Sequence, residues 1–499
     1  MAINTIFKTV NTDYERTLDG KQIVTQCNFD TQSRGGVSKL CVLTGDVQIT
    51  KVQTLSKQIK ISGRLALKLV YLDGEKKLNN FDYISDFAED INDDQIVAEM
   101  PCIVKADIVD IQSAIAGNEI KVQTVIELVP NIVEIATSEI IEEAEGALTL
   151  KEEQSYQKYI GMVEEECEIS EEYACGVKVE DILLYDTKAI VCEVNNDDGK
   201  LCVSGKAEIT LVYKAEGIVS TKNMSLPFMY ELKVKGENLN ACISVKVKES
   251  KLVIEGDEND NILKSYVTLC IRGFVMQREC VNAVVDLYSP SHELEISKNK
   301  VCFMRQGCMR RFEERISGSV AVDDDDSIES ILSTVVTQNS LSNLVAMDGE
   351  VLAEGVVNTS VIYLNDKGEN KCMQVELPYS LQFACEGMQE DVKLSGMALV
   401  SDCAYKKKRD REVEISLTVE LSVCTKQEVE QCIISKVEEG EECEHNHNAV
   451  SIYLPDKGET IWQVAKTLGM SIESIKEQNP DIANEMQGDE RIVIYREIV

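Results

Sequence analysis

The feature that most constrains the fold of this chain is an internal repeat. Three segments, "GRLALKLVY", "GKAEITLVY" and "GVVNTSVIY", share a glycine that precedes a tyrosine by eight residues. Between the two, polar and apolar residues roughly alternate, which is the pattern of a half-buried β-strand. The glycines are Gly63, Gly205 and Gly355, and the tyrosines are Tyr71, Tyr213 and Tyr363.

A second strand pattern follows each copy: "KVQTVIELV" from Lys121, "SYVTLCIRG" from Ser265 and "VEISLTVEL" from Val413. The three glycines recur at intervals of 142 and 150 residues, which is too long for a solenoid repeat and typical of tandem globular domains. Strands and helices do not alternate, so we expect each copy to form an antiparallel sandwich or a partly closed barrel. The fold class is therefore predicted to be mainly β, with three tandem sandwich-like domains.

The spacing of the copies sets the predicted boundaries. The three β domains are expected at 1–140, 161–300 and 301–436. Segment 141–160, which is rich in polar residues, is predicted to be a helical linker. Segment 437–448 is acidic and is predicted to be a solvated linker. It precedes a separate small module at 449–499.

The last 50 residues combine strand and helix signals. "SIYLP" from Ser451 alternates like a strand, and Thr460 with Gln463 forms a capping-box pattern at the start of a helix. The apolar stripe of that helix is followed by Gly469, a residue type that suits the C′ position. Ser471 begins a second helix that ends at 479–480, and "RIVIY" from Arg491 adds a closing strand. The predicted order is strand, helix, helix, strand, a small α+β (βααβ) domain.

At these residues the module resembles a LysM domain. The Gly-Asp-Thr motif of that family is represented by Gly458-Glu459-Thr460, with Glu in place of Asp. The Trp/Ile-rich first helix is represented by Ile461-Trp462, the end of the second helix by Asn479-Pro480, and the final turn by "QGD" from Gln487.

The LysM resemblance implies a shallow groove for glycans that contain N-acetylglucosamine, such as peptidoglycan or chitin-like polymers. Carried over by position, one wall contains Gly458, Glu459 and Thr460, and the other contains Ile475, Asn479 and Pro480. Several of these residues also have folding roles as cap, helix stop or core. Trp462 is predicted to point away from the apolar stripe, to be partly exposed and to contact a partner.

The three repeats are similar to SPOCS domains of spore-forming bacteria. A run of such repeats that ends in one LysM domain is typical of clostridial coat proteins that interact with SpoIVA. The resemblance implies synthesis in the mother-cell cytoplasm and a place at the forespore surface. It also implies that the protein attaches coat layers to a SpoIVA-like coat scaffold, and that the LysM domain takes part in that contact.

Charge and composition limit the choice of partners and compartment. The formal net charge of −36 disfavours nucleic acid and anionic membranes as partners and favours proteins with basic patches. The first residues lack the pattern of a signal peptide, and no window has the apolar length of a membrane span. The 18 cysteines include no CxxC pair, which favours buried, reduced thiols in a cytosolic protein.

No catalytic, metal or cofactor site is predicted. Cys443, His445 and His447 lie close together but lack the rest of a structural zinc framework. "DDDD" at 323–326 lacks the alternating ligands and the glycine of an EF-hand loop. Phosphate-loop and nucleophile-elbow motifs are absent from the sequence.

Three hypotheses remain. The first is a non-catalytic spore-coat adaptor that binds a SpoIVA-like protein through its LysM module. The second is a peptidoglycan-binding cell-wall protein, and the third is a wall hydrolase with an unrecognised active site.

Overall fold

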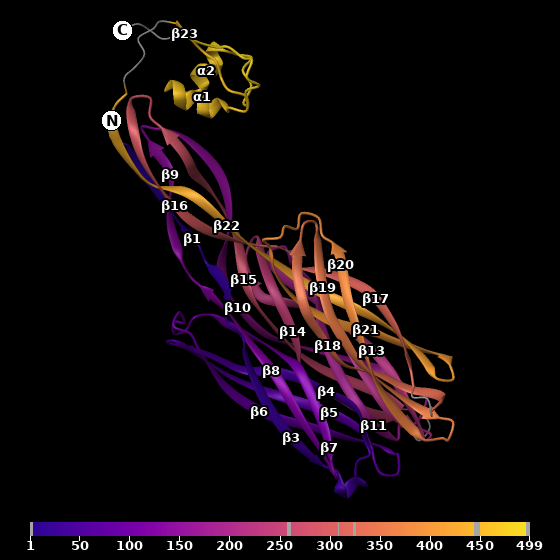
Figure 1. The fold of residues 1–499 in the computed structure, drawn as a ribbon. Helices are drawn as coiled ribbons and strands as arrows, with labels where there is room; N and C mark the ends of the chain where they lie inside the picture. Colours follow the sequence, from indigo (N-terminus) through magenta and orange to yellow (C-terminus); the bar gives the residue numbers. More distant parts are fainter. Residues whose placement is uncertain (1–2, 257–260, 308, 323–325, 444–449, 496–499) are drawn as a thin grey trace.

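The computed structural model describes residues 3–256, 261–307, 309–322, 326–443 and 450–495. Three β-sandwiches lie side by side at one end of an elongated molecule, and a narrow stalk of strands leads from them to a small C-terminal module (Figure 1). The chain is mainly β, as predicted, and the only α-helices in the described residues are the two of this module.

Each repeat contains a three-stranded antiparallel sheet whose strands follow one another in sequence. This sheet contains the Gly–Tyr motif in its central strand, and Figure 1 labels these strands except β12. The strands are β4 (Lys39–Leu55), β5 (Gln58–Leu72) and β6 (Leu78–Asn92); β11 (Asp181–Asp197), β12 (Lys200–Ala215) and β13 (Ile218–Lys235); and β18 (Ile328–Met347), β19 (Glu350–Asn365) and β20 (Asn370–Ala384).

A second sheet faces the first in each repeat, and its central strand is the one predicted from the second pattern. In repeat 1, β8 (Glu119–Glu134) pairs with β2 (Tyr14–Thr17), β3 (Lys21–Asp30) and β7 (Cys102–Ala116). In repeat 2, β15 (Asn261–Tyr288) lies between β10 (Leu148–Ala174) and β14 (Leu239–Gly256). In repeat 3, β22 (Glu412–Glu442) pairs with β16 (His292–Gln306), β17 (Arg310–Ala321) and β21 (Lys393–Arg409). A short 3-10 helix, Gln32–Arg34, follows β3.

The glycine of the repeated motif has the same structural role in all three copies. It pairs across the sheet with an aromatic residue of the third strand: Gly63 with Phe87, Gly205 with Phe228 and Gly355 with Tyr379. A Cβ at any of these glycines would lie within 3 Å of that ring and of a backbone oxygen of the first strand. The first strand is bulged opposite each glycine. Because the motif glycine has no side chain, the aromatic ring of the third strand can lie over the bulge of the first strand. The role of the motif is therefore structural.

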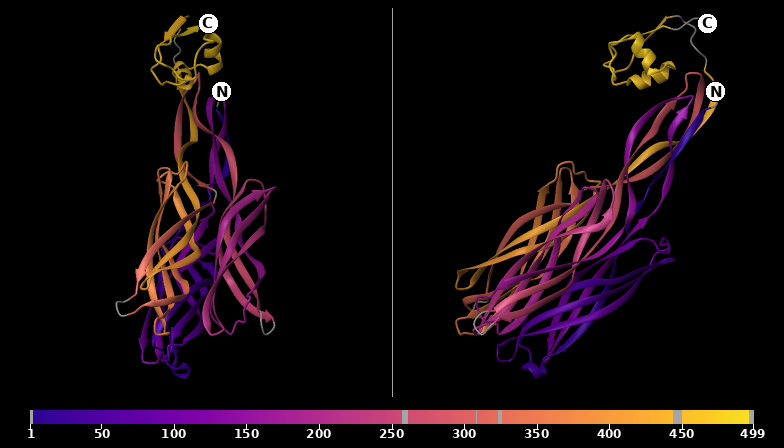
Figure 2. Two further views of the ribbon diagram at one scale, coloured as in Figure 1. Left: turned by 90° about the vertical axis from the view of Figure 1, so that its right-hand side faces the viewer. Right: turned by 180° about the vertical axis from the view of Figure 1, so that it is seen from behind.

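The stalk consists of three antiparallel ribbons, one from each repeat. Repeat 1 contributes β1 (Asn4–Asn11) with β9 (Thr137–Glu145), and repeats 2 and 3 contribute the ends of β10 with β15 and of β16 with β22. Their inward side chains form one apolar core. It includes Val10, Ile140, Tyr156, Val281, Phe303 and Ile433. Figure 2 shows these ribbons rising together from the sandwiches.

The predicted helical linker at 141–160 is wrong. Residues up to Glu145 belong to β9, and β10 begins at Leu148 and runs without interruption from the stalk into the second sandwich. Its polar residues favour a helix by propensity, but pairing with β15 along its whole length and burial of Tyr156 (3% exposed) override that preference.

The ends of the repeats also differ from the predicted boundaries. Strands place the three repeats at 4–145, 148–288 and 292–442 rather than 1–140, 161–300 and 301–436. The first part of the predicted acidic linker belongs to β22, which ends at Glu442, and residues 444–449 lie outside the described residues. The discrepancy arises because each repeat begins and ends in a stalk ribbon that carries no part of the sequence motif.

The three sandwiches also share an apolar cluster between their first sheets. Val70, Val212 and Ile362, each one residue before the motif tyrosine, are fully buried in it. The tyrosines belong to the cores of their own sandwiches. Both faces are therefore buried at the ends of the central strands β5, β12 and β19. The repeats pack around a common axis instead of forming a string of separate domains.

Candidate functional site

The C-terminal module has the predicted βααβ order. It contains β23 (Val450–Tyr453), α1 (Ile461–Leu468), α2 (Ile472–Gln478) and β24 (Ile492–Tyr495), and the two strands pair antiparallel. Thr460 and Gln463 form the capping box, and Gly469 ends α1 in the left-handed conformation with φ of 61°. Ser471 caps α2 by accepting a hydrogen bond from the Ser474 N–H. These local signals set the ends of the two helices.

The first predicted wall, 458–460, lies against a segment that sequence reasoning missed. The Gly458 N–H donates to the Met486 carbonyl at 2.8 Å, and the Met486 N–H donates to the Glu459 carbonyl at 2.9 Å. Thr460 forms a β-bridge with Glu485. Residues 484–486, which follow α2, are therefore part of this wall. Gly458 and Thr460 remain exposed.

The other predicted residues differ in accessibility. Ile475 is fully buried in the module core. The Asn479 side chain donates to the carbonyls of Ile475 and Val493 and accepts from the Val493 N–H, so it fastens the end of α2 to β24. Glu459 accepts from the Tyr453 hydroxyl at 2.8 Å and the Asp456 N–H at 3.0 Å. Pro480 is exposed. Of the predicted site residues, Gly458, Thr460 and Pro480 therefore remain exposed to a ligand.

Trp462 contacts the stalk instead of solvent, contrary to the prediction that it is partly exposed. Its side chain is 8% exposed and meets the ring of Tyr288 edge-on, with ring centroids 4.9 Å apart. Its Nε1–H donates to Asp286 Oδ2 at 2.8 Å. Tyr288 in turn donates from its hydroxyl to the Met470 carbonyl at 2.6 Å. The indole therefore holds the module onto the end of β15.

An ion pair completes this contact, which we call the dock. Lys466 Nζ lies 2.7 Å from Asp286 Oδ1. Burial alone would raise the pKa of Asp286, but hydrogen bonds from Lys466 and Trp462 and the lysine charge hold it below its usual value. Leu148 and Leu150 of β10 pack against the same apolar cluster. Nothing in the sequence connects these residues with Trp462.

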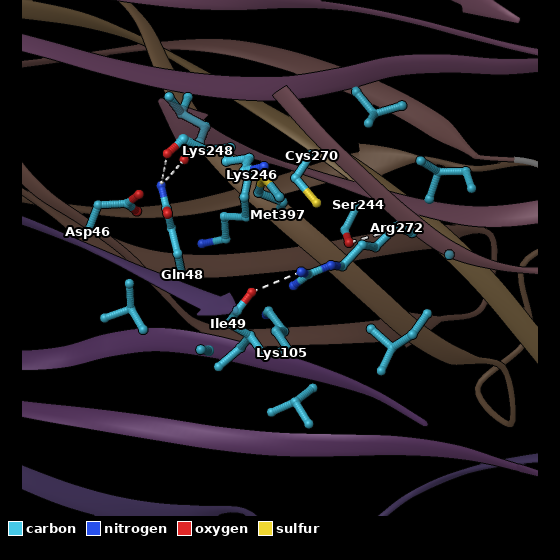
Figure 3. Close-up of a pocket in the computed structure, with 18 of the residues that line it drawn as sticks. Asp46, Gln48, Ile49, Lys105, Ser244, Lys246, Lys248, Cys270, Arg272 and Met397 are labelled. Atoms are coloured by element: carbon cyan, nitrogen blue, oxygen red, sulfur yellow. Dashed lines mark hydrogen bonds between the residues drawn. The ribbon is translucent and has the colours of Figure 1, made fainter. Parts of the chain in front are cut away.

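A second candidate site is a cavity of about 730 Å³ between the repeats. Figure 3 shows residues of repeats 1, 2 and 3 that line it, among them Gln48, Lys246, Arg272 and Met397. Gln48 donates to the Lys248 carbonyl at 2.9 Å, and Arg272 donates to the Ile49 carbonyl at 2.8 Å. These hydrogen bonds cross from repeat 1 to repeat 2.

The charged groups around the cavity are paired with one another. Lys246 Nζ lies 3.2 Å from an Asp107 oxygen, and Lys426 pairs with Glu15. Lys68 lies 3.5 Å from an oxygen of Asp186. Because these charges offset each other, the cavity is not specialised for an ion of either sign.

A metal site would need several His, Cys, Asp or Glu side chains close together in the described part of the chain. There, no group of three or more His, Cys, Asp and Glu side chains is arranged to hold a metal ion. His292 Nδ1 lies 3.2 Å from Glu439 Oε1 and 3.0 Å from the Ser291 hydroxyl. His445 and His447 lie outside the described residues. No helix in the described segments has both the length and the apolar character that a membrane crossing requires.

Comparison with known proteins gave one match. Residues 36–116 match the family described as "SipL, SPOCS domain", so this segment is similar to that domain, as predicted. The match includes β4 to β7 of repeat 1. No curated protein and no solved structure matched the chain significantly. The resemblance of the C-terminal module to LysM domains rests on its motifs and on its βααβ order.

Proposed function

We propose that this chain is a non-catalytic adaptor in spore-coat assembly that binds a SpoIVA-like coat scaffold through its C-terminal module. The similarity of residues 36–116 to the SPOCS domain supports a role in sporulation. The observation that carries the adaptor role is the position of the module. It lies at the tip of the stalk, and the three sandwiches form a broad body at the opposite end (Figure 2). Two separated ends suit a protein that joins two layers.

The partner surface on the module is proposed to be the one formed by Gly458, Thr460 and Pro480. These residues are exposed, whereas Trp462 is occupied by the dock. With a net charge of −36, the chain is expected to attract a partner with a basic patch, and salt weakens such an association. The proposed location is the mother-cell cytoplasm at the forespore surface.

The experiment compares two ligands with the full chain. Purified SpoIVA-like scaffold and insoluble peptidoglycan are each incubated with the protein, and the bound fraction is measured. We expect retention by the scaffold and none by peptidoglycan. Retention by peptidoglycan alone would favour the second hypothesis, a cell-wall protein that binds N-acetylglucosamine glycans, and would overturn the adaptor.

Variants locate the surface. Gly458→Asn introduces a residue that tolerates the local φ of 84° and adds a side chain on the first proposed wall. Pro480→Tyr adds bulk at the exposed position of the second proposed wall. Each should weaken scaffold binding by about tenfold or more, the effect of losing a central interface contact. The control is Ile452→Tyr, at a 61% exposed position on β23, which should bind like the parent chain. Equal weakening by all three would contradict the assignment of the surface.

Localisation in sporulating cells gives an independent test. A fluorescent fusion of the full chain should surround the forespore and lose that pattern with Gly458→Asn. Uniform labelling of the vegetative cell wall would contradict the adaptor role.

A further inference from the structure

Two pairs of cysteines from different repeats lie in contact inside the body. Cys242 on β14 of repeat 2 hydrogen-bonds with Cys424 on β22 of repeat 3. Cys41 on β4 of repeat 1 hydrogen-bonds with Cys372 on β20 of repeat 3. None of the cysteines in the described residues forms a disulfide. The two pairs differ in their access to solvent, and that difference supports the inference.

Cys242 and Cys424 share one neighbour, Ser395, which brings them together. Cys242 Sγ lies 3.4 Å from the Ser395 hydroxyl. Ser395 on β21 is the direct cross-strand neighbour of Cys424 on β22, and opposite residues in antiparallel strands present their side chains on the same face. The two thiols therefore meet where β14 of repeat 2 crosses the β21–β22 pair of repeat 3.

This pair faces the central cavity. Both cysteines line it, together with the exposed residues Ser244 and Lys248, so the cavity has access to solvent. Cys242 is half-buried and Cys424 is 1% exposed. A small reagent in the cavity therefore meets Cys242 first.

Cys242 is also an acidic thiol. The hydrogen bond with Cys424, and then the charge of Lys426 and the hydrogen bond with Ser395, lower the pKa of Cys242 to about 7, although burial and the charge of Glu15 oppose this. A thiolate is the form that attacks a disulfide, and a thiol with a pKa near the ambient pH attacks fastest.

We propose that Cys242 and Cys424 form a redox-active dithiol that closes to a disulfide between repeats 2 and 3 by exchange with a small organic disulfide. The Cys242 thiolate attacks one sulfur of the reagent, its S–S bond breaks, and one thiolate leaves. Cys424 then loses its proton and attacks Cys242 Sγ in the mixed disulfide, which releases the second thiolate. The reagent is reduced to two thiols, and the protein loses two hydrogens as it is oxidised.

The bond would fix the central contact of the adaptor body. It would join strands that are far apart in the sequence and belong to separate sandwiches, and such cross-links stabilise by restricting the unfolded chain. The inference does not depend on which partner the C-terminal module binds.

Cys41 and Cys372 provide an internal reference. They are 0% and 2% exposed and belong to the apolar cluster between the sandwiches. Burial in that cluster keeps a dissolved reagent away from both sulfur atoms. The two thiols of this pair are in contact across repeats, but a dissolved reagent cannot reach them. Comparison of the two pairs therefore separates the effect of reagent access from that of thiol proximity.

The test uses the full reduced chain with 2-hydroxyethyl disulfide, a small uncharged reagent. After timed incubation at pH 7.5 the protein is quenched with acid, alkylated, digested and analysed by mass spectrometry. We expect a peptide pair linked through Cys242 and Cys424 that forms at least ~10-fold faster than one linked through Cys41 and Cys372. Equal rates for the two pairs, or a mixed disulfide at Cys242 that never resolves, would overturn the proposal.

Variants test the order of the two exchange steps. Cys424→Ala should leave Cys242 as a stable mixed disulfide and move the pH midpoint of its reaction above 7, because the hydrogen bond that stabilises the thiolate is lost. Cys242→Ser should abolish the linked peptide, whereas Cys280→Ser, at an exposed cysteine of β15, should leave it unchanged. Circular dichroism checks that each variant is folded. Closure in folded Cys242→Ser, or an unshifted midpoint in folded Cys424→Ala, would contradict the mechanism.

Discussion

The junction among the three repeats and the junction between the stalk and the C-terminal module have different designs. Among the repeats, fully buried aliphatic residues such as Val70, Val212 and Ile362 exclude water. At the dock, one indole meets one tyrosine ring and shares a carboxylate with a lysine. At the first junction this cluster is apolar and belongs to the folding core, whereas paired charges line the cavity elsewhere between the repeats. The second is small and partly polar, which is typical of a contact that opens without unfolding the rest.

The largest expected effect is at the junction of the repeats. Val212→Asp places an unpaired charge in the shared apolar cluster and should reduce the free energy of unfolding by about 4 kcal/mol or more. The control Val24→Asp, at a 57% exposed position of β3, should cost less than about 1 kcal/mol. Chemical denaturation followed by circular dichroism measures both. Similar losses for the two variants would contradict a shared core between the sandwiches.

A smaller effect is expected at the dock. Tyr288→Ala removes the ring that Trp462 contacts and should weaken docking by about 2 kcal/mol, with the unfolding of the body unchanged. Trp462 is the only tryptophan in the chain, so its fluorescence emission reports the dock directly and should shift to longer wavelength. Tyr266→Ala, at a 48% exposed position of the same strand, is the matched control. A body that unfolds earlier in Tyr288→Ala would show that the two junctions are coupled.

The smallest effect is a dependence of the dock on pH. The pKa of Asp286 is lowered in the docked state, so its contribution is complete above the ordinary carboxyl pKa of about 3.9. As pH falls through the lower docked value, protonation removes the ion pair and the contribution is lost. Trp462 emission should therefore shift below about pH 4, at a pH where circular dichroism still shows a folded body.

Asp286→Asn is the control for this titration. The amide oxygen can still accept from the indole but carries no charge, so docking should be weaker at neutral pH and no longer change in acid. A variant that titrates like the parent chain would exclude Asp286 as the responsible group.

Local sequence signals predicted those parts of the molecule that depend on near neighbours. The capping box of Thr460 and Gln463 and the left-handed Gly469 both appear as expected. The alternation after Gly63, Gly205 and Gly355 predicted the central strand of each sheet. In each case the groups that determine the conformation lie within a few residues of one another in the sequence.

Predictions failed where pairing with a distant strand determines the conformation of a segment. The polar segment 141–160 forms strands because β9 pairs with β1 and β10 pairs with β15. The apolar pair Val70-Tyr71 was a usable signal that both faces of the strand end are buried, since strict alternation would expose one of the two. No comparable signal indicated the stalk or the burial of Trp462. The side chains of the stalk core come from all three repeats, and Trp462 packs against Tyr288 of repeat 2.

By itself, therefore, the sequence determined the β class, the number of repeats and the capped helices of the C-terminal module, since backbone propensity, side-chain period and caps act over a few residues. Only the tertiary structure decided that the repeats pack around one axis and that their ends form a stalk. It also brought Cys242 beside Cys424 and placed Trp462 against Tyr288. Those contacts depend on which buried faces meet, and burial is set by strands that are far apart in the chain.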